Sequence, residues 1–211
     1  MITRIFRYAT KPGAGAKGHD DTASAAHQVL SSQAGFVARL LARNTDGPGD
    51  YLDVVTWTSL AQAKASSSAA AKDRAVRTWL EHVDEPSVQG CSTRTSAAVS
   101  RAPAALGDAA VAAWLFVQWR LLPDIDVVEH MRNEAAIQHE IFGVLPGYLG
   151  AYSMHEIDGR KCMSLSAWAS MKDAKAGVAE ALRTENALLQ RHMADCEPDA
   201  AIEYFAPLLT T

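Results

Sequence analysis

Apolar and polar positions along the chain predict one order of elements twice: strand, helix, strand, strand, helix, strand. Strands are indicated by β-rich or alternating apolar runs, helices by apolar residues every three to four positions, and turns by Pro and Gly. In the first half the elements are expected at residues 3–9, 20–33, 36–43, 51–58, from 60 onward with a helical stretch at 76–82, and 88–94. In the second half they are expected at residues 112–121, 126–142, 148–155, 162–168, 172–192 and 201–205.

The two halves also match in their residues. Segment 27–36 recurs as segment 139–148, with a histidine, a glycine and an aromatic residue in register. Segment 57–65 recurs as segment 168–176, where Trp, Ser and Ala-Lys-Ala are repeated. The distance along the chain from the first segment to its repeat is one residue longer than the distance from the second segment to its repeat. We place that extra residue in a hairpin turn, because turns tolerate insertions and deletions. We interpret the repeat as a tandem duplication.

Each half then packs as two layers, with its helices over one face of a small sheet. The other sheet face would stay apolar and exposed unless the two sheets of the chain cover each other. We expect one unit over residues 1–97 and a second over 111–211. Residues 98–110 between them are expected to be a linker, since the stretch 96–110 is rich in Ala, Ser, Pro and Gly.

The amino-acid composition limits the classes of molecule that the protein is expected to bind. The net charge is −4 and the sequence pI is near 6.0, so no basic field attracts nucleic acid or an anionic membrane. The three cysteines are widely spaced without a Cys-x-x-Cys pair, which argues against a disulfide framework or structural zinc and fits a cytoplasmic protein. Arginines interrupt the first apolar run, unlike a signal peptide, and no run approaches the ~20 residues of a membrane span. A small-molecule ligand or substrate is the expected partner.

The repeated histidines are the first candidates for chemistry. His27 and His139 are each expected on or beside the apolar stripe of a helix. An imidazole there suits a general base, because its ordinary pKa lies near neutrality. The alternative is a core imidazole that only bonds a neighbouring strand. By helical rotation His130 is expected on the opposite, exposed face, and His192 at a helix end.

The repeated tryptophans are the second candidates. Strand alternation places Trp57 on one face with Val55 and Asp53, and Trp168 with Ser166 and Ser164. An indole beside small polar residues suits stacking on an aromatic ligand, and the alternative is plain core packing. Tyr152 is a further candidate because its phenol suits polarisation of a carbonyl, and Trp119 lies on the first strand of its half. Arg4 and Arg7 on the first strand suit a carboxylate or a solvated edge.

The markers Lys11-Pro12-Gly13, Gly35-Phe36 and Trp57-Thr58-Ser59, with Pro146-Gly147-Tyr148 and Trp168-Ala169-Ser170 in the second half, resemble the dimeric α+β barrel superfamily and its antibiotic biosynthesis monooxygenase (ABM)-like domains. The resemblance implies an α+β fold in which two tandem ferredoxin-like (βαββαβ) units form an intramolecular dimeric α+β barrel with antiparallel sheets. It also implies a ligand cavity between a sheet and its helices. Its members include cofactor-free oxygenases, haem-degrading enzymes and proteins without known activity.

Three functions therefore stay open. The first is a cofactor-independent monooxygenase acting on a small aromatic or polyketide-like substrate, with His139 and Tyr152 as catalytic residues. Its substrate would contact Trp168, Ser166 and Trp119 in the second half. The first half would either keep a second substrate-binding site at His27 and Trp57 or serve as a structural partner. The second is a non-catalytic small-molecule-binding or stress-associated protein, and the third binds or degrades haem. No cofactor is expected for the first, no metal motif such as His-Glu-x-x-His is legible, and a further homodimer is left open.

Overall fold

The structure is a computed structural model that describes residues 1–47, 50–95, 106, 108–157 and 159–210. It divides into unit 1, Met1–Thr93 with Pro207–Thr211, and unit 2, Arg94–Ala206. Most of the predicted linker, residues 98–105 and 107, lies outside the described residues. Among the described helices, none is long and apolar enough to cross a membrane.

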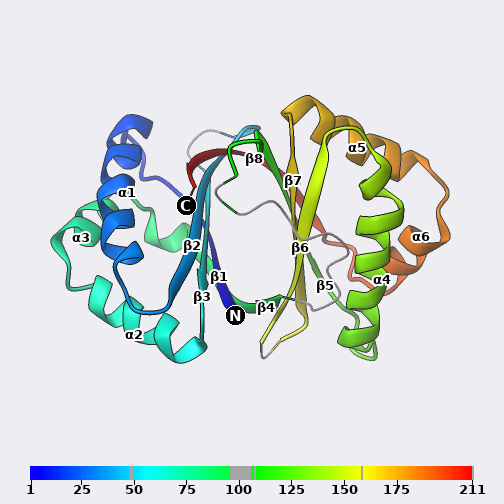
Figure 1. Ribbon diagram of the computed structural model, residues 1–211, viewed down its shortest axis with the longest axis horizontal. Coiled ribbons are helices and arrows are strands. Elements are labelled where there is room, and N and C mark those ends of the chain that lie inside the picture. The colour runs from blue at the N-terminus through cyan, green and yellow to red at the C-terminus, as the bar shows by residue number, and fades with distance from the viewer. Residues whose placement is uncertain (48–49, 96–105, 107, 158, 211) are drawn as a thin grey trace. The chain divides into compact units, whose positions relative to one another are not determined.

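Unit 1 is a sheet with helices on one face (Figure 1). Strand β3 lies between β1 and β2, and β4 pairs with the other side of β1, all antiparallel. The elements are β1 (Ile2–Ala9), α1 (Ala16–Ser31), β2 (Phe36–Asn44), β3 (Asp50–Trp57), α2 (Leu60–Ala70), α3 (Arg74–Leu80), the short 3-10 helix η1 (Glu85–Ser87) and β4 (Gln89–Thr95).

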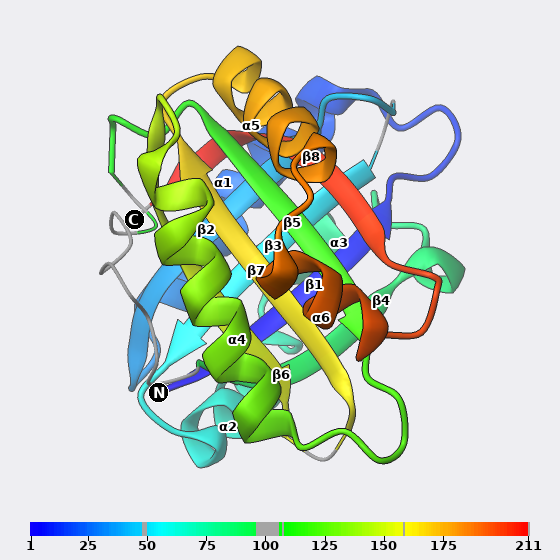
Figure 2. The same ribbon diagram turned by 90° about the vertical axis from the view of Figure 1, so that its right-hand side faces the viewer.

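Unit 2 repeats this arrangement, with α4, α5 and α6 in front of its sheet in Figure 2. Strand β7 lies between β5 and β6, and β8 pairs with the other side of β5. The elements are β5 (Ala113–Arg120), α4 (Val127–Glu140), the 3-10 helix η2 (Phe142–Val144), β6 (Tyr148–Glu156), β7 (Lys161–Trp168), α5 (Met171–Arg183), α6 (Ala187–Ala194) and β8 (Ala201–Thr210). The single helix predicted over 172–192 is therefore two helices, and Asn186 caps the second by accepting from the Leu188 amide at 2.8 Å.

The predicted fold class is confirmed. Each unit has the βαββαβ order of a ferredoxin-like unit, with an extra helix before its last strand. Within each unit the sheet is antiparallel, with the strand order β4-β1-β3-β2 in unit 1 and β8-β5-β7-β6 in unit 2.

The repeated glycines and serines have local structural reasons. Gly35 and Gly147 precede the second strand of their units with φ of +82° and +77°, a conformation that favours glycine. A Cβ at either position would also come within 3 Å of the side chain of the following helix, Gln62 or Asp173. Ser59 begins its helix by accepting the Gln62 amide at 3.2 Å. These residues are therefore explained by the fold and do not by themselves indicate a reaction.

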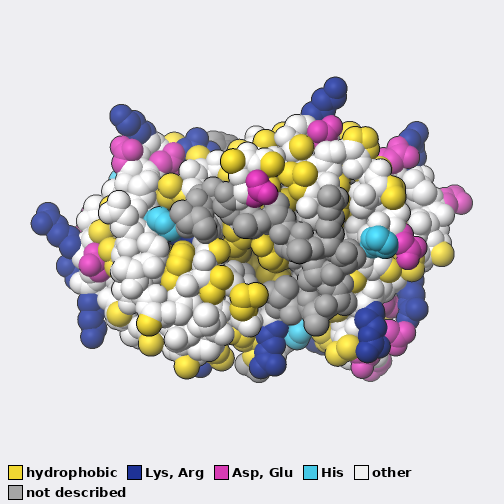
Figure 3. All heavy atoms as spheres, viewed as in Figure 1, with side chains coloured by type: hydrophobic (Ala, Val, Ile, Leu, Met, Phe, Trp, Pro, Cys, Tyr) yellow, Lys and Arg dark blue, Asp and Glu magenta, His cyan; other side chains and the backbone are white. Residues whose placement is uncertain are grey.

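Figure 3 shows the charged side chains on one face of the molecule. On the face shown in Figure 3, lysine and arginine side chains stand apart from one another and alternate with acidic ones. That face of the described residues has no continuous basic field of the kind that nucleic acid requires.

Candidate functional site

Unit 1 contains a cavity of about 290 Å³ between its sheet and helices α2 and α3. The sheet contributes alternate residues of β1 and β3, because side chains two apart on a strand face the same way. The helices contribute small residues that leave the space open, among them Ser67, Ala70 and Ala71. The sheet side is Arg4, Phe6, Tyr8, Asp53, Val55 and Trp57. The predicted common face of Asp53, Val55 and Trp57 is thus confirmed.

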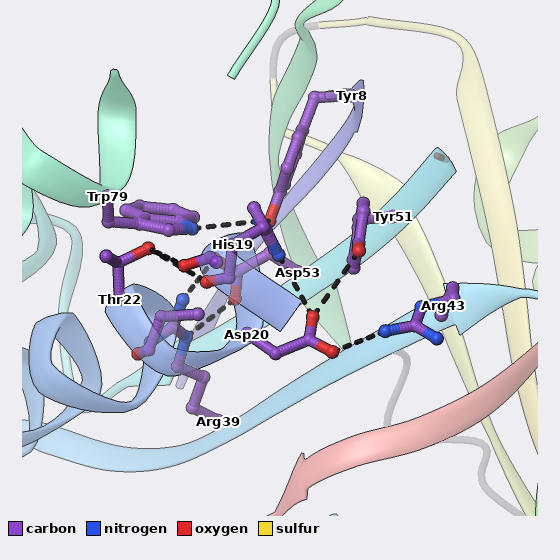
Figure 4. A network of polar contacts seen from close by, with 11 residues as sticks. Tyr8, His19, Asp20, Thr22, Arg39, Arg43, Tyr51, Asp53 and Trp79 are labelled. Carbon is purple, nitrogen blue, oxygen red and sulfur yellow. Dashed lines mark hydrogen bonds and ion pairs between the residues drawn. The ribbon is translucent and has the colours of Figure 1, made fainter. Parts of the chain in front are cut away.

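One end of this cavity is a buried hydrogen-bonded cluster around His19 (Figure 4). His19 is fully buried on α1, and its Nε2 lies 3.0 Å from the Tyr8 hydroxyl. The indole Nε1 of Trp79 donates to the same Nε2 at 3.0 Å. Both Tyr8 and Trp79 line the cavity, so His19 lies directly behind its wall.

The protonation state of this cluster follows from its contacts. His19 Nδ1 faces Asp20 Oδ1 at 3.2 Å, which places the ring proton on Nδ1 and the acceptor lone pair on Nε2. Burial lowers the pKa of His19, so the ring is neutral near pH 7. Burial, reinforced by the charge of Asp53, raises the pKa of Tyr8 well above its ordinary value. A neutral proton acceptor therefore sits behind a protonated phenol.

A buried ion pair lies beside this cluster. Arg39 Nε and Nη2 donate to the two carboxylate oxygens of Asp53 at 2.9 and 2.8 Å. Burial alone would lower the pKa of Arg39, but the attraction and hydrogen bonds of Asp53 outweigh it and raise that pKa. Since both charges are paired inside the protein, Asp53 is a cavity wall with a fixed partner rather than a free base.

Arg4 lies toward the other end of the cavity. Its guanidinium packs over the Phe6 ring, 4.9 Å from the centroid, and donates to the Ser67 hydroxyl. Its Nε–H is buried and has no hydrogen-bond partner among the described residues. An unpaired buried N–H of a cation is costly, and an anionic oxygen of a ligand would satisfy it.

Unit 2 has a smaller cavity in the same place, about 160 Å³, and its wall includes Trp119, Ser164, Ser166 and His192. Helix α4 adds Glu134 and Gln138 to this wall. Gln138 Nε2 donates to Glu134 Oε1 at 2.8 Å and to the Ser164 hydroxyl at 3.1 Å. Tyr148 donates to Gln138 Oε1 at 2.9 Å. Burial raises the pKa of Glu134, so this cavity has a weakly acidic, hydrogen-bonding floor.

Unit 2 also contains the counterpart of His19. His130 follows His19 at the same sequence spacing that separates Trp57 from Trp168. It is 1% exposed and accepts the Trp119 indole N–H at 3.0 Å. Its Nδ1 lies 3.1 Å from Asp195 Oδ2. The surface position predicted for His130 is therefore wrong, because the rotation argument fixed the wrong buried face for α4.

The predicted site residues fall into three groups. Trp57 lines the unit 1 cavity, and Trp119 and Ser166 line the unit 2 cavity. His27 is half-buried against the Phe36 ring, which in turn contacts Trp57 edge-on. Trp168 is buried in the core behind its cavity and donates to Ser166 Oγ at 3.0 Å.

The two residues expected to be catalytic lie elsewhere. His139 is exposed, so its predicted place on the buried stripe is wrong. Its neighbour Gln138 faces inward instead, one residue of helix rotation away. Tyr152 is half-buried on β6 and lines neither cavity, and burial raises the pKa of its phenol.

Sequence reasoning missed His19, Tyr8, Glu134 and Gln138. One signal for His19 was present, because the spacing of the two tryptophans also relates His19 to His130. The other three depend on which helix faces and strand ends meet, which the repeat does not encode.

Comparison with known proteins finds one family model, which matches most of the first unit. Residues 1–78 match the family model Antibiotic biosynthesis monooxygenase. No curated protein sequence matches the chain.

Solved structures give the fold of the whole chain. The crystal structure of an anthrone oxidase-like protein is 14% identical, with a TM-score of 0.71, and the match covers 100% of this chain and 92% of that one. A candidate monooxygenase from Fusobacterium nucleatum is 9% identical, with a TM-score of 0.71 and coverage of 99% and 93%. A mutant chlorite dismutase from Candidatus Nitrospira defluvii is 10% identical, with a TM-score of 0.59 and coverage of 98% and 91%.

At such identities these structures establish a shared fold and no more. Their near-complete coverage extends over both units, whereas the family model covers the first. Residues 1–78 therefore match an ABM model, and the whole chain resembles ABM-like domains fused in tandem, as its sequence predicted.

Proposed function

We propose that the chain is a cofactor-independent monooxygenase that oxidises a small, electron-rich aromatic or polyketide-like substrate in the unit 1 cavity. One observation carries the proposal: this cavity has a phenol backed by a neutral imidazole at one end and an unpaired buried guanidinium N–H toward the other. The shared fold with an anthrone oxidase-like protein supports the same chemistry.

The cavity suits a flat, elongated substrate. Arg4 and Tyr8 are four residues apart on one face of β1, which separates them by about 13 Å along the strand. Between them the wall is aromatic, with Phe6 and Trp57 available for stacking. At about 290 Å³ the cavity is near the lower end of the range for drug-sized ligands. Two or three fused rings with oxygen functions at both ends fit these constraints.

The proton step uses Tyr8 as a relay. A substrate hydroxyl gives its proton to the Tyr8 oxygen while Tyr8 passes its own proton to His19 Nε2, and the Trp79 N–H gives up its hydrogen bond to that nitrogen. The products are a substrate anion and an imidazolium, which Asp20 stabilises from the Nδ1 side. Asp20 is partly exposed and pairs with Arg43, so the proton has a route to solvent. Arg4 then stabilises charge that develops at the far end of the ring system.

Oxygen chemistry follows from the anion itself. The electron-rich anion transfers one electron to O₂, and the radical pair combines to a peroxide at a ring carbon. For a CH₂ centre, loss of water then gives C=O, so that the substrate and O₂ yield a ketone and one water. The protein supplies the proton transfer, orientation and exclusion of solvent.

The test is oxygen uptake with anthrone-like and quinol-like substrates. We expect turnover by the unaltered chain and a loss of about 100-fold or more in kcat for Tyr8→Phe, the size typical of a lost proton-transfer group. Trp119→Phe, at the equivalent position of unit 2, is the matched control and should retain activity. A urea midpoint for each variant separates lost chemistry from lost folding.

Three results would redirect the proposal. Turnover that survives Tyr8→Phe but is lost in His139→Ala would return the base to His139. Loss in Trp119→Phe alone would move the site to unit 2. Ligand binding without oxygen uptake would favour the non-catalytic binding protein.

Haem fits neither cavity. Among the described histidines, only His192 lines one of the two cavities, and that cavity is about 160 Å³. Haem is at least drug-sized, and ligands of that size occupy about 300–1,000 Å³. We derive no haem chemistry, and a haem titration without a Soret shift is the expected result.

A further inference from the structure

A cluster of metal-ligating side chains lies in unit 2, beside its cavity and outside the proposed oxygenase site. His130 belongs to α4, His192 to α6, and Cys196 follows α6. One ligand atom from each lies within 4.8 Å of the other two. The two imidazole rings are 4.6 Å apart between centroids, and His130 is fully enclosed.

We propose that His130, His192 and Cys196 form a binding site for a borderline transition-metal ion such as Zn²⁺. Two imidazoles and one thiolate are the donor types that such an ion prefers. Bonds of about 2.0–2.3 Å place tetrahedral ligands roughly 3.3–3.8 Å apart, so the cluster closes by about 1 Å on binding. Helix α6 has no buried side chain, which allows that movement.

Asp195 orients the His130 ring as a metal ligand. Its Oδ2 lies 3.1 Å from His130 Nδ1, which fixes the ring proton there and directs the Nε2 lone pair away. A carboxylate that holds the other nitrogen of a histidine is the usual support of a metal ligand. The Nε2 lone pair accepts the Trp119 N–H, and the metal ion takes the place of that donor.

The remaining donors fit an open site. Cys196 Sγ donates its proton to the His192 carbonyl at 2.9 Å, and coordination releases that proton to solvent. His192 Nδ1 is buried without a hydrogen bond among the described residues, 3.4 Å from Glu134 Oε2. Glu134 lies outside the group of three clustered ligand atoms. The fourth position is therefore left to a water molecule, which the Glu134 carboxyl is near enough to hold.

Unit 1 offers an internal control for the site. Its equivalent of His130 is His19, and His82 ends the corresponding helix region, but at the same sequence spacing Glu85 takes the place of Cys196. Among the described residues, unit 1 shows no cluster of this kind.

The experiment is anaerobic titration of the full chain with Co²⁺ as a spectroscopic probe, followed by displacement with Zn²⁺. We expect one ion per chain and a thiolate-to-cobalt charge-transfer band. Cys196→Ser should abolish the band, whereas Cys162→Ser, which removes the buried thiol packed in the neighbouring core, should retain it. His192→Ala should weaken Zn²⁺ binding at least tenfold and His82→Ala should not.

Two further variants test the geometry. Asp195→Asn should weaken binding by about 10- to 100-fold through the orientation of His130. Trp119→Phe should strengthen it, because the competing N–H donor is gone. The proposal is overturned if the band persists in Cys196→Ser, if binding is not stoichiometric in the unaltered chain, or if His82→Ala weakens it as much as His192→Ala.

Discussion

The two units place different polar groups in the same space between sheet and helices. In unit 1 the strands supply a charged pair, Arg39 with Asp53. In unit 2 the position equivalent to Asp53 is Ser164, and the acidic group comes from α4, with Glu134 where unit 1 has Ala23. In unit 1 the Ala23 carbonyl lies 3.4 Å from the Arg39 guanidinium. The acidic group of the interior thus belongs to the sheet in unit 1 and to the helix in unit 2.

The buried histidines show the same principle. His19 and His130 each accept an indole N–H at 3.0 Å and each face a carboxylate. In unit 1 the indole comes from α3 and the carboxylate is the next residue. In unit 2 the indole comes from the first strand, and Asp195 lies far along the chain, just after α6. In both units each ring nitrogen of the buried histidine has a hydrogen-bond partner, as burial requires. The residues that supply these partners differ between the units.

The largest effect is expected from breaking the charged pair of unit 1. Arg39→Met leaves the Asp53 carboxylate buried and unpaired, and it should lower the free energy of unfolding by about 3–5 kcal/mol. Urea denaturation measures the loss.

Two controls give this result its meaning. The double variant Arg39→Met with Asp53→Leu should recover most of the stability, since no charge remains buried. Glu134→Gln in unit 2 should cost much less, because burial already raises the pKa of that carboxyl. Equal losses from Arg39→Met and Glu134→Gln would show that the two interiors do not differ as argued.

The tryptophans provide the next test. Trp57 lines its cavity, whereas Trp168 is fully enclosed against α5, where an added Cβ at Gly177 would lie 2.5 Å from its ring. Gly177→Ala should therefore lower the free energy of unfolding by about 1–3 kcal/mol through overpacking. The higher helix propensity of alanine should offset roughly 1 kcal/mol of that loss. Thermal unfolding, with near-ultraviolet circular dichroism for the indole, measures both effects.

Unit 1 supplies the matched variant. Ser66 is its equivalent of Gly177 at the spacing of the two tryptophans, and the Ser66 hydroxyl is buried without a hydrogen bond among the described residues. Ser66→Ala removes that unsatisfied group and should be neutral or stabilising by about 1 kcal/mol. A stabilising Gly177→Ala would mean that Trp168 has more room than its packing indicates.

The third prediction concerns pH. Burial lowers the pKa of His19 from its ordinary 6.5, so the unfolded chain binds this proton first as the pH falls. The contribution of neutral His19 to the free energy of unfolding is fully present above pH 6.5. It is lost as the pH falls toward the folded-state pKa, with a slope of at most about 1.4 kcal/mol per pH unit. His19→Gln should flatten the slope by about one proton, measured by urea midpoints between pH 7 and 5. Because burial also lowers the pKa of His130, part of the slope should remain.

The sequence predicted the architecture well because the architecture is repeated. Strand alternation placed Asp53, Val55 and Trp57 on one face correctly, since the period of two leaves no ambiguity. The helix faces were less certain, because an error of one residue rotates a side chain by about 100°. Pairing His27 with His139 introduced that error. At the spacing that relates His19 to His130, the partner of His27 is Gln138, and the extra residue lies in the loop that follows.

The candidate site was predicted only in part, for a related reason. Trp57 was placed on the cavity face by strand alternation, whereas Trp119 was named only from its place on the first strand of its half. The relay of Tyr8 with His19 joins a strand end to a helix start, and the Arg39–Asp53 pair joins neighbouring strands. Such contacts depend on tertiary register, which a single sequence does not state.

The smallest expected effect tests that helix register directly. His139 is exposed near the end of α4, so His139→Ala should change the free energy of unfolding by no more than about 0.5 kcal/mol. Gln138→Ala, one residue earlier, removes hydrogen bonds to Glu134, Ser164 and Tyr148 and should cost about 1–3 kcal/mol. Urea denaturation of the two variants measures the contrast between adjacent residues. A larger loss at His139 than at Gln138 would reverse the assignment of the buried face, and with it the pairing of His19 with His130 on which the comparison of the units rests.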